Sequence, residues 1–272
     1  MPELPEVETI RRELLPLVIG RRIVGVEPFW DKTLKGANAA DFNKLFAGRV
    51  INSLERRGKY LIFKLEDDKC FSIHFRMTGS IITGAGDGNL PRYCRAIIRL
   101  DGKLSLFFID PRKFGCIEVL DSCDSALSRL GPEPLDDSFS PEMLEKILSG
   151  RKTPIKSALL NQHNIAGIGN MYADEALFQA RIHPLRPADK ISSEEVQLLY
   201  DAIRSVLTQA IERKGATVSD YTRPGGEAGR AQDDFCVAHR RGCNCPLCNN
   251  PIERTVVGQR GTYFCPVCQP RG

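Results

Sequence analysis

The first clear pattern of apolar and polar positions follows directly on the N-terminus. Between Glu6 and Ile19 the apolar side chains recur three or four positions apart, with charged residues between them. That period places them on one face of a helix, and Gly20 is a typical helix stop. We therefore predict an amphipathic helix whose last turn is disturbed by Pro16. Its apolar face consists of Val7, Ile10, Leu14, Leu17 and Val18.

From Arg22 to Leu120 the apolar residues gather in short runs rich in β-branched and aromatic side chains. Such runs, separated by turn residues, are typical of strands. One short helix is expected among them, from Asp41 to Phe46. The pattern predicts a mostly antiparallel sandwich or barrel with helices at its edges. The expected strands are Ile23 to Val26, Tyr60 to Leu65, Phe71 to Phe75, Ser80 to Thr83, Ala96 to Leu100, Leu104 to Ile109 and Cys116 to Leu120.

The helical period returns after a segment rich in Ser, Asp and Pro, in which we place the interdomain linker, 131–140. The chain is thus predicted to be an α+β protein. An N-terminal antiparallel β-sandwich with flanking helices (1–130) precedes a helical domain (141–234) and a terminal hairpin (235–272). Glycines between Thr222 and Asp234 indicate a loose loop, a candidate mobile element. The expected helices are Pro141 to Leu148, Ile155 to Gln162, Met171 to Gln179 and Ser193 to Lys214.

The cysteines near the end of the chain form two Cys-x-x-Cys pairs. Paired thiolates at this separation are typical of a tetrahedral zinc site, with a β-hairpin between the pairs. A site filled by four sulfurs is closed, so one structural Zn²⁺ is expected to fold the hairpin without taking part in chemistry. Arg260 falls at or near the hairpin tip, and Cys243 is an alternative ligand with poorer spacing. The expected ligands are Cys245, Cys248, Cys265 and Cys268.

The remaining cysteines are scattered, which favours reduced thiols and, with them, a cytoplasmic protein. No apolar run is long enough to cross a membrane, and the N-terminus lacks the layout of a signal peptide. The net charge is +4, and basic residues cluster at several separated points along the chain. Such clusters indicate a surface for a polyanion, although a single cluster is more often a solvated face. The scattered cysteines are Cys70, Cys94, Cys116, Cys123, Cys236 and Cys243.

The second residue, Pro2, offers a candidate nucleophile. Initiator Met is normally removed before a small residue, which would leave Pro2 with a free secondary amine. An α-amino group titrates near pH 8, so it is partly neutral in cells and can attack a carbonyl-like carbon to form an iminium. Glu3 and Glu6 follow where a proton donor and a charge partner would be needed. The alternative is an ordinary helix start, with Pro5 in the first turn and acids at the positive end of the helix dipole.

Further motifs accompany this N-terminus and the cysteine pairs, in order along essentially the whole chain. They are Arg57-Gly-Lys59, His74-Phe-Arg-Met77-Thr-Gly79, Asp110-Pro-Arg112-Lys-Phe114-Gly115 and Ile165-Ala-Gly-Ile-Gly-Asn170-Met-Tyr. Taken together, the motifs resemble those of the formamidopyrimidine-DNA glycosylases, bacterial enzymes that remove 8-oxoguanine and ring-opened purines. The resemblance implies that the C-terminal half is a helix-two-turn-helix domain ending in a zinc finger.

The resemblance also implies a mechanism. Pro2 matches the family's nucleophile, which attacks C1′ of the damaged nucleotide, expels the base and leaves a Schiff base. Glu3 matches the acid that assists base departure and opening of the sugar ring. Elimination at the β and then the δ position follows, so the enzyme would be both a glycosylase and an AP lyase of base excision repair. Zinc is the one cofactor implied.

Several cations are implied to contact DNA. Lys59 matches a lysine that contacts the lesion and its phosphate, and Arg260 matches the finger arginine that contacts flanking phosphates. Asn170 resembles the phosphate contact of the helix-two-turn-helix motif, where backbone amides at a helix start also bind phosphate. Without the resemblance, Lys59 and Arg260 would be read as solvated surface residues. The basic positions expected along the DNA groove are Arg151, Lys152 and Lys156.

A base inside a duplex must be flipped out to be reached, and glycosylases are a standard example. Met77 and Phe114 match the family's apolar wedges, and Arg112 matches the residue that hydrogen-bonds the orphaned partner base. From periodicity alone, Met77 and Phe114 would be core residues. The chain departs from the family pattern at Tyr93, where many members have a DNA-contacting histidine. It departs again at Val237-Ala-His-Arg240, which lacks a phosphate-contacting tyrosine.

The expected partner is therefore damaged double-stranded DNA, with no membrane, no required protein partner and a monomeric state. A non-enzymatic zinc protein that binds duplex DNA is the alternative of a different class, and retention of Met1 would favour it. Endonuclease VIII, which favours oxidised pyrimidines, is a related enzyme alternative. Its usual opening is Pro-Glu-Gly-Pro-Glu, so Leu4 argues against it.

Overall fold

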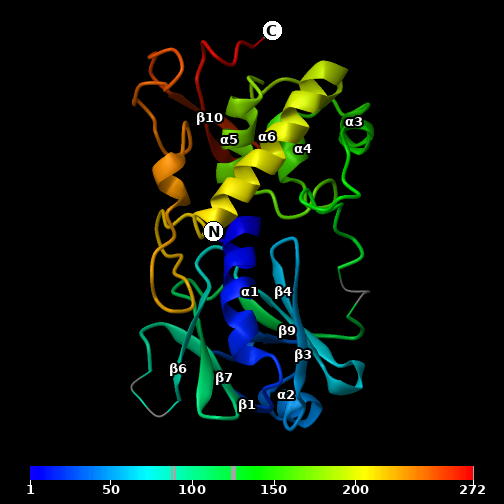
Figure 1. Ribbon diagram of the computed structural model, residues 1–272, viewed down its shortest axis with the longest axis vertical. Coiled ribbons are helices and arrows are strands. Elements are labelled where there is room, and N and C mark those ends of the chain that lie inside the picture. Colours follow the sequence, from blue (N-terminus) through cyan, green and yellow to red (C-terminus); the bar gives the residue numbers. More distant parts are fainter. Residues whose placement is uncertain (87, 89, 124–126, 272) are drawn as a thin grey trace. The chain divides into compact units, whose positions relative to one another are not determined.

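The computed structural model describes residues 1–86, 88, 90–123 and 127–271 and resolves the chain into two compact units (Figure 1). The first unit contains Met1–Arg129 together with Arg213–Gln232, and the second contains Leu130–Glu212 together with Asp233–Gly272. The predicted helical domain, 141–234, had included the segment Arg213–Gln232, which instead packs with the N-terminal unit. Residues 87, 89 and 124–126 of the predicted first domain, and residue 272 of the predicted finger, lie outside the described residues.

Two sheets form the body of the first unit. One has the strand order β1-β7-β8-β6, and the other has the order β2-β9-β5-β4-β3. Neighbouring strands are antiparallel except for the short parallel pair of β2 and β9. The strands are β1 (Ile23–Pro28), β2 (Leu34–Lys35), β3 (Ile51–Arg57), β4 (Tyr60–Leu65), β5 (Cys70–His74), β6 (Ser80–Ala85), β7 (Cys94–Leu100), β8 (Leu104–Ile109) and β9 (Cys116–Leu120).

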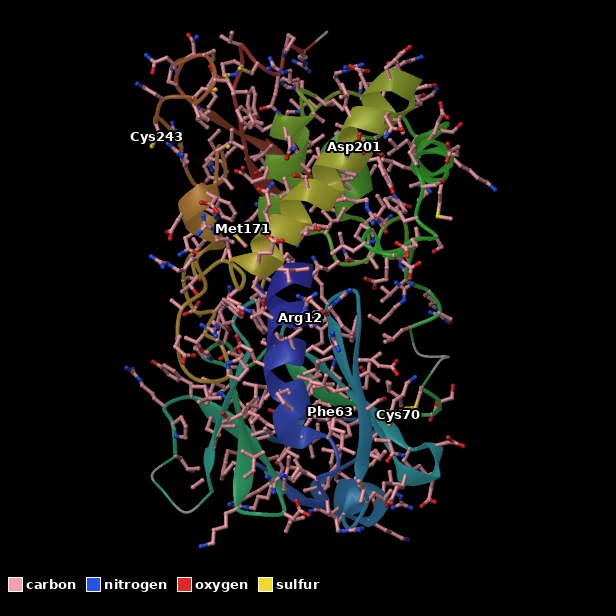
Figure 2. All side chains as sticks on the ribbon, in the orientation of Figure 1. Arg12, Phe63, Cys70, Met171, Asp201 and Cys243 are labelled. Carbon is pink, nitrogen blue, oxygen red and sulfur yellow. A yellow bond between two sulfur atoms is a disulfide. The ribbon has the colours of Figure 1, made fainter. Side chains whose placement is uncertain are left out.

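One apolar core joins the two sheets, as the predicted sandwich requires. It takes Ile98 and Phe108 from one sheet and Phe63 and Ile117 from the other, all almost completely buried. Phe63, labelled in Figure 2, stacks on Phe71 of the neighbouring strand with ring centroids 4.7 Å apart. The short helix α2 (Ala39–Phe46) adds two further aromatic rings to this core. The seven predicted strands and this helix are confirmed, with shifts of a few residues at their ends.

Of the two strands of the first unit that the sequence did not predict, β2 has only two residues, and the other is β3. Its buried positions, Ile51 and Leu54, are three residues apart, because the strand pairing shifts between Ile51 and Ser53. Such a bulge breaks the two-residue alternation by which strands are recognised in a sequence. Polar and charged residues occupy the remainder of the strand, so an apolar run is absent as well.

The N-terminal helix α1 (Leu4–Val18) packs on β3 and β4. It begins at Leu4, two residues before the predicted start, because Glu3 and Glu6 form a capping box at its first turn. The Glu6 carboxylate accepts a hydrogen bond from the Glu3 backbone N–H at 2.7 Å. The helix continues past Pro16 to Val18, so this proline does not end it.

Two of the scattered cysteines are paired in a disulfide. Cys70, at the start of β5 and labelled in Figure 2, is bonded to Cys123 beyond the end of β9. The prediction that the scattered cysteines are all reduced is therefore wrong for this pair. The pairing follows from the sheet register, since Cys70 lies opposite Leu120 and the chain needs three more residues to bring Cys123 back beside it. Spacing along the sequence does not reveal that proximity.

The second unit is built from helices and a terminal hairpin, as predicted. Helix α5 contacts α4, α6 and the strand β11, and α3 packs on α6. Among the described residues, no helix is long and apolar enough to cross a membrane. The elements are α3 (Pro141–Leu148), α4 (Ile155–Leu160), α5 (Asn170–Gln179), α6 (Ser193–Glu212), β10 (Glu253–Val257) and β11 (Arg260–Phe264).

Candidate active site

The N-terminal residues Pro2 and Glu3 are buried at the start of α1, and the chain around them is fixed by hydrogen bonds. Glu6 binds the Glu3 N–H with one carboxylate oxygen and the Ala216 N–H with the other, at 2.8 Å. A Cβ on the neighbouring Gly215 would lie 2.9 Å from Glu6 Cγ, and Gly215 also has a φ of +75°, so this close approach needs glycine. Glu6 thus holds the peptide that follows Pro2 in a defined position.

Lys59 occupies the tight turn between β3 and β4. Arg57 pairs with Tyr60, so Gly58 and Lys59 are the two central residues of the turn. The φ of Gly58 is +56°, and a glycine with positive φ at the first central position is typical of two-residue hairpin turns. Although the turn projects from the hairpin, Lys59 is only 7 % exposed. The reading of Lys59 as a plain surface lysine is therefore wrong.

The candidate wedge residues and Tyr93 come from three loops that Asp110 joins. The buried Asp110 carboxylate accepts hydrogen bonds from the backbone N–H groups of Phe114 and Gly115, both at 2.7 Å, and from the Thr78 hydroxyl. The Asp110 N–H in turn donates to the Tyr93 carbonyl at 3.0 Å. The loops of Thr78, of Tyr93 and of the Asp110-Pro-Arg motif are therefore held together.

Aromatic and cationic side chains on these joined loops are exposed to solvent. Phe114 is 53 % exposed, so the periodicity-based reading of Phe114 as a core residue is wrong. The Arg112 guanidinium lies 4.8 Å from the centroid of the Phe114 ring, and Arg92 lies 4.5 Å from that of Tyr93. Met77 is half-buried. The first unit thus presents an exposed aromatic and cationic surface at the positions that the sequence motifs singled out.

The prediction that Lys156 lies along a DNA groove is wrong. Its side chain is completely buried and pairs with Asp174 of α5 at 2.7 Å. Its Nζ also donates to the Thr262 hydroxyl at 2.8 Å and to the Gly261 carbonyl at 3.3 Å. Lys156 cannot reach a phosphate from this position. Instead, it joins α4 and α5 to the hairpin strand β11.

The other cations of the second unit that were expected to contact DNA are exposed. Arg151 and Lys152 are exposed before α4, and Arg260 is exposed at the first position of β11, next to the hairpin turn. Asn170 is the first residue of α5, and its side-chain amide donates to the Gly261 carbonyl at 2.9 Å. Asn170 thereby binds the carbonyl of the residue that directly follows Arg260 in the hairpin.

The four predicted zinc ligands are gathered at one point. The Sγ atoms of Cys245, Cys248, Cys265 and Cys268 all lie within 4.8 Å of one another. Sγ–Sγ distances of 3.8 Å (Cys245–Cys268) and 3.4 Å (Cys248–Cys265) fit a tetrahedron with Zn–S bonds of about 2.3 Å, which separates sulfurs by about 3.8 Å. This donor set fits one structural zinc ion, and Cys243 is not part of the cluster.

Glu175 and Asp110 are buried acids whose organising role was not predicted. Glu175 accepts hydrogen bonds from three successive backbone N–H groups, at Cys236, Val237 and Ala238, at 2.7–2.8 Å. Asp110 accepts hydrogen bonds from two successive backbone N–H groups of its own loop, those of Phe114 and Gly115. The sequence Asp-Pro offers a hint for Asp110, since Asp commonly binds backbone amides at the start of a turn. Glu175 has no such signal, because its partners are more than sixty residues away.

Comparison with known protein families matches three successive parts of the chain. Residues 1–117 match the formamidopyrimidine-DNA glycosylase N-terminal domain, and residues 130–222 match the H2TH domain of the same enzymes. Residues 244–271 match a zinc finger found in FPG and IleRS. The chain belongs to the formamidopyrimidine-DNA glycosylase family. It is therefore a DNA glycosylase with a helix-two-turn-helix domain and a zinc finger.

Full-length relatives agree with this assignment. A formamidopyrimidine-DNA glycosylase of Symbiobacterium thermophilum is 45 % identical, over 99 % of this chain and 90 % of the relative. The crystal structure of the MutM (FPG) protein from Thermus thermophilus is 42 % identical, with a TM-score of 0.90 and complete coverage of both chains. A Lactococcus lactis FPG mutant in complex with DNA containing Fapy-dG is 34 % identical, with a TM-score of 0.92, over 99 % of this chain and all of that one.

Proposed function

We propose that the protein excises oxidised purines, 8-oxoguanine and formamidopyrimidines, from duplex DNA and then cleaves the strand at the resulting site. The observation that carries the proposal is the N-terminus, where Pro2 and Glu3 are buried and fixed at the start of α1. The Lactococcus lactis relative binds DNA that contains Fapy-dG, which supports this class of lesion. A processed chain that begins at Pro2 would present a secondary amine at that point.

The proposed reaction begins with attack of the Pro2 nitrogen on C1′ of the damaged nucleotide. The new N–C1′ bond replaces the bond to the base, which leaves with a proton, and Glu3 serves as the acid that assists departure and opening of the sugar. The product is an iminium. Loss of a C2′ proton then expels the 3′ phosphate by β-elimination, and a second elimination expels the 5′ phosphate. Hydrolysis of the iminium returns the free amine of Pro2.

The remaining predicted residues are proposed to bind the substrate. Lys59, from its turn in the first unit, would contact the lesion and its phosphate. Phe114 and Met77 would fill the gap that base flipping leaves, and Arg112 would hydrogen-bond the unpaired partner base. The exposure of Phe114 is compatible with this role, since a wedge residue must be accessible to the base stack.

The phosphate contacts of the second unit are proposed for its exposed cations and the start of α5. Arg260, Arg151 and Lys152 are exposed, and Asn170 begins a helix whose first N–H groups can bind phosphate. Lys156 is omitted because it is buried and paired. We further propose that the protein acts as a monomer without a protein partner.

The test is covalent trapping. Borohydride reduces an iminium to a stable amine, so the chain that begins at Pro2 should become bonded to a duplex with 8-oxoguanine opposite cytosine. A matched sample that retains Met1 carries an amide nitrogen at Pro2 and should bind the duplex without excising the base or forming an adduct. Intact mass defines the N-terminus of each sample. Absence of an adduct with the Met1-free chain, or normal excision by the blocked chain, would refute the proposed nucleophile.

A further inference from the structure

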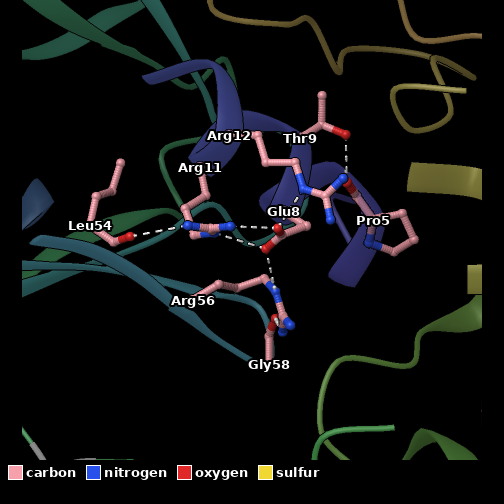
Figure 3. A network of polar contacts seen from close by, with 8 residues as sticks. All are labelled: Pro5, Glu8, Thr9, Arg11, Arg12, Leu54, Arg56 and Gly58. Atoms are coloured by element: carbon pink, nitrogen blue, oxygen red, sulfur yellow. Dashed lines mark hydrogen bonds and ion pairs between the residues drawn. The ribbon is translucent and has the colours of Figure 1, made fainter. Parts of the chain in front are cut away.

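A cluster of arginines surrounds the buried acid Glu8 on α1, and it contains residues from both α1 and β3 (Figure 3). Arg11 binds Glu8 through two nitrogens, at 2.8 and 3.0 Å, and Arg12 binds it at 2.7 Å. Arg56 of β3 donates from Nε to the second oxygen of Glu8 at 3.1 Å. Arg11 also reaches the Leu54 carbonyl of β3, at 3.5 Å. The cluster therefore fastens α1 to β3.

Arg56 extends this connection to the turn between β3 and β4. While its Nε binds Glu8, its Nη1 donates to the Gly58 carbonyl at 3.1 Å. That carbonyl belongs to the peptide bond between Gly58 and Lys59, so the guanidinium fixes the backbone from which the Lys59 side chain leaves. A planar guanidinium can hold two acceptors in fixed directions, which a lysine ammonium cannot do in the same way.

The geometry of the cluster favours a rigid connection over a flexible surface pair. The side chains of Glu8 and Arg56 are 9 % and 11 % exposed, whereas Arg12 is 56 % exposed and contributes mainly charge. Burial raises the pKa of Glu8, but hydrogen bonds and charges from Arg11, Arg12 and Arg56 outweigh burial and lower the pKa to about 2. Glu8 therefore remains ionised at any pH at which the enzyme would be assayed.

We propose that Arg56, held by Glu8, is a positioning residue that sets Lys59 relative to the N-terminal residues Pro2 and Glu3. The two ends of the connection support this role. Glu8 lies about one turn from the start of the helix that Pro2 and Glu3 precede. Gly58 directly precedes Lys59 in the turn. The proposal rests on the function proposed above, because it assigns Arg56 an effect through Lys59 on the same reaction.

The experiment uses the full-length protein with Met1 removed and a duplex with 8-oxoguanine opposite cytosine. Arg56→Lys keeps the positive charge beside Glu8 but loses the simultaneous bond to the Gly58 carbonyl. We expect single-turnover base release to fall by about 10- to 100-fold, since a misplacement of about 1 Å can cost about 100-fold. Affinity for a duplex with an abasic-site analogue and the melting temperature should stay close to those of the wild type.

A matched control comes from the same hairpin. Glu55→Gln removes the partner of Lys64, an ion pair of 2.9 Å that does not contact the turn. This variant should release the base at the wild-type rate. If Glu55→Gln slows base release as much as Arg56→Lys does, general disturbance of the hairpin explains both and the proposal is overturned.

A double-mutant cycle separates positioning from a structural effect. If Arg56 acts through Lys59, then Arg56→Lys should have no further effect on base release in the Lys59→Met background. Full persistence of the effect in that background, or a wild-type rate for Arg56→Lys alone, would overturn the proposal. A wild-type protein that forms no borohydride adduct would instead refute the proposed function, so the two failures can be told apart.

Discussion

Each unit of this glycosylase contains a buried acid that ties a helix to a hairpin, and the two acids differ in their surroundings. In the first unit, Glu8 joins α1 to the hairpin that carries Lys59. In the second, Asp174 and Lys156 join α4 and α5 to the hairpin that carries Arg260. Glu8 has three arginine partners, one of them largely exposed. Asp174 has one lysine, and both side chains are completely buried.

The pKa values of the two acids move in opposite directions. For Asp174, burial outweighs the Lys156 ammonium and the Tyr263 N–H and raises the pKa to about 7. For Glu8, three cations outweigh burial and lower the pKa to about 2. The comparison shows that burial in an ion pair does not by itself fix the direction in which the pKa of the acid shifts. Its electrostatic balance depends on how many partners replace the lost water.

The largest expected difference between the two regions is their dependence on zinc. A structural zinc site contributes on the order of 10 kcal/mol to the folding of its domain. Removal of zinc by a chelator should unfold β10 and β11 and take the Thr262 and Gly261 contacts away from Lys156. Hydrogen exchange followed by mass spectrometry should then show loss of protection in β11, with the β3–β4 hairpin unchanged. Equal loss in both hairpins would contradict this distinction.

A smaller difference is expected from removal of each acid. Asp174→Ala leaves the ammonium of Lys156 buried without its carboxylate, at a cost of about 3–5 kcal/mol of unfolding free energy. Glu8→Gln should cost less, about 1–3 kcal/mol, because an amide still accepts hydrogen bonds and Arg12 remains hydrated. Denaturant unfolding measures both values.

The control for Asp174→Ala is the double variant Lys156→Met with Asp174→Leu. Replacement of both charges by apolar groups should recover most of the lost stability, since no charge is then left buried. If the double variant is less stable than Asp174→Ala alone, the hydrogen bonds to Thr262 and Gly261 would outweigh the desolvation of the pair.

The smallest expected effect is a difference in the pH dependence of stability. The folded-state pKa of Glu8 lies below the ordinary 4.5, so its contribution is present above that pH and is lost as pH falls toward about 2. The folded-state pKa of Asp174 lies above the ordinary 3.8, so its contribution is present at low pH and is lost as pH rises through about 7.

Melting temperatures of Glu8→Gln and Asp174→Asn, each compared with the wild type across this range, measure the two dependences. The deficit of Glu8→Gln should shrink in acid, whereas Asp174→Asn should improve relative to the wild type as pH rises. If the melting-temperature difference from the wild type changed with pH in the same direction for both variants, the pKa values of the two acids would be shifted in the same direction.

Local sequence patterns predicted most of the secondary structure. The apolar period revealed α1 and the helices of the second unit, and the Cys-x-x-Cys pairs revealed the hairpin and its zinc ligands. The strand β3 was missed because its bulge and its charges hide the alternation. The Cys70–Cys123 disulfide was missed because the pairing depends on sheet register.

The candidate site was predicted less evenly. Sequence motifs singled out Pro2, Lys59 and Phe114. In the structure, Pro2 lies at a fixed N-terminus, Lys59 in a tight turn and Phe114 in an exposed loop. Lys156 was predicted along the DNA groove from the family resemblance. The prediction failed because its buried partner Asp174 lies on a different helix.

The sequence by itself determined the family, the zinc ligands and the order of the elements, because these depend on residue types at short and regular spacings. Only the tertiary structure decided which charged side chains face solvent and which hold the scaffold together. A charge becomes structural when a distant segment supplies a counter-charge or a hydrogen-bond donor and excludes water. For Glu8, Asp110, Asp174 and Glu175 that segment could not be read from the neighbouring residues.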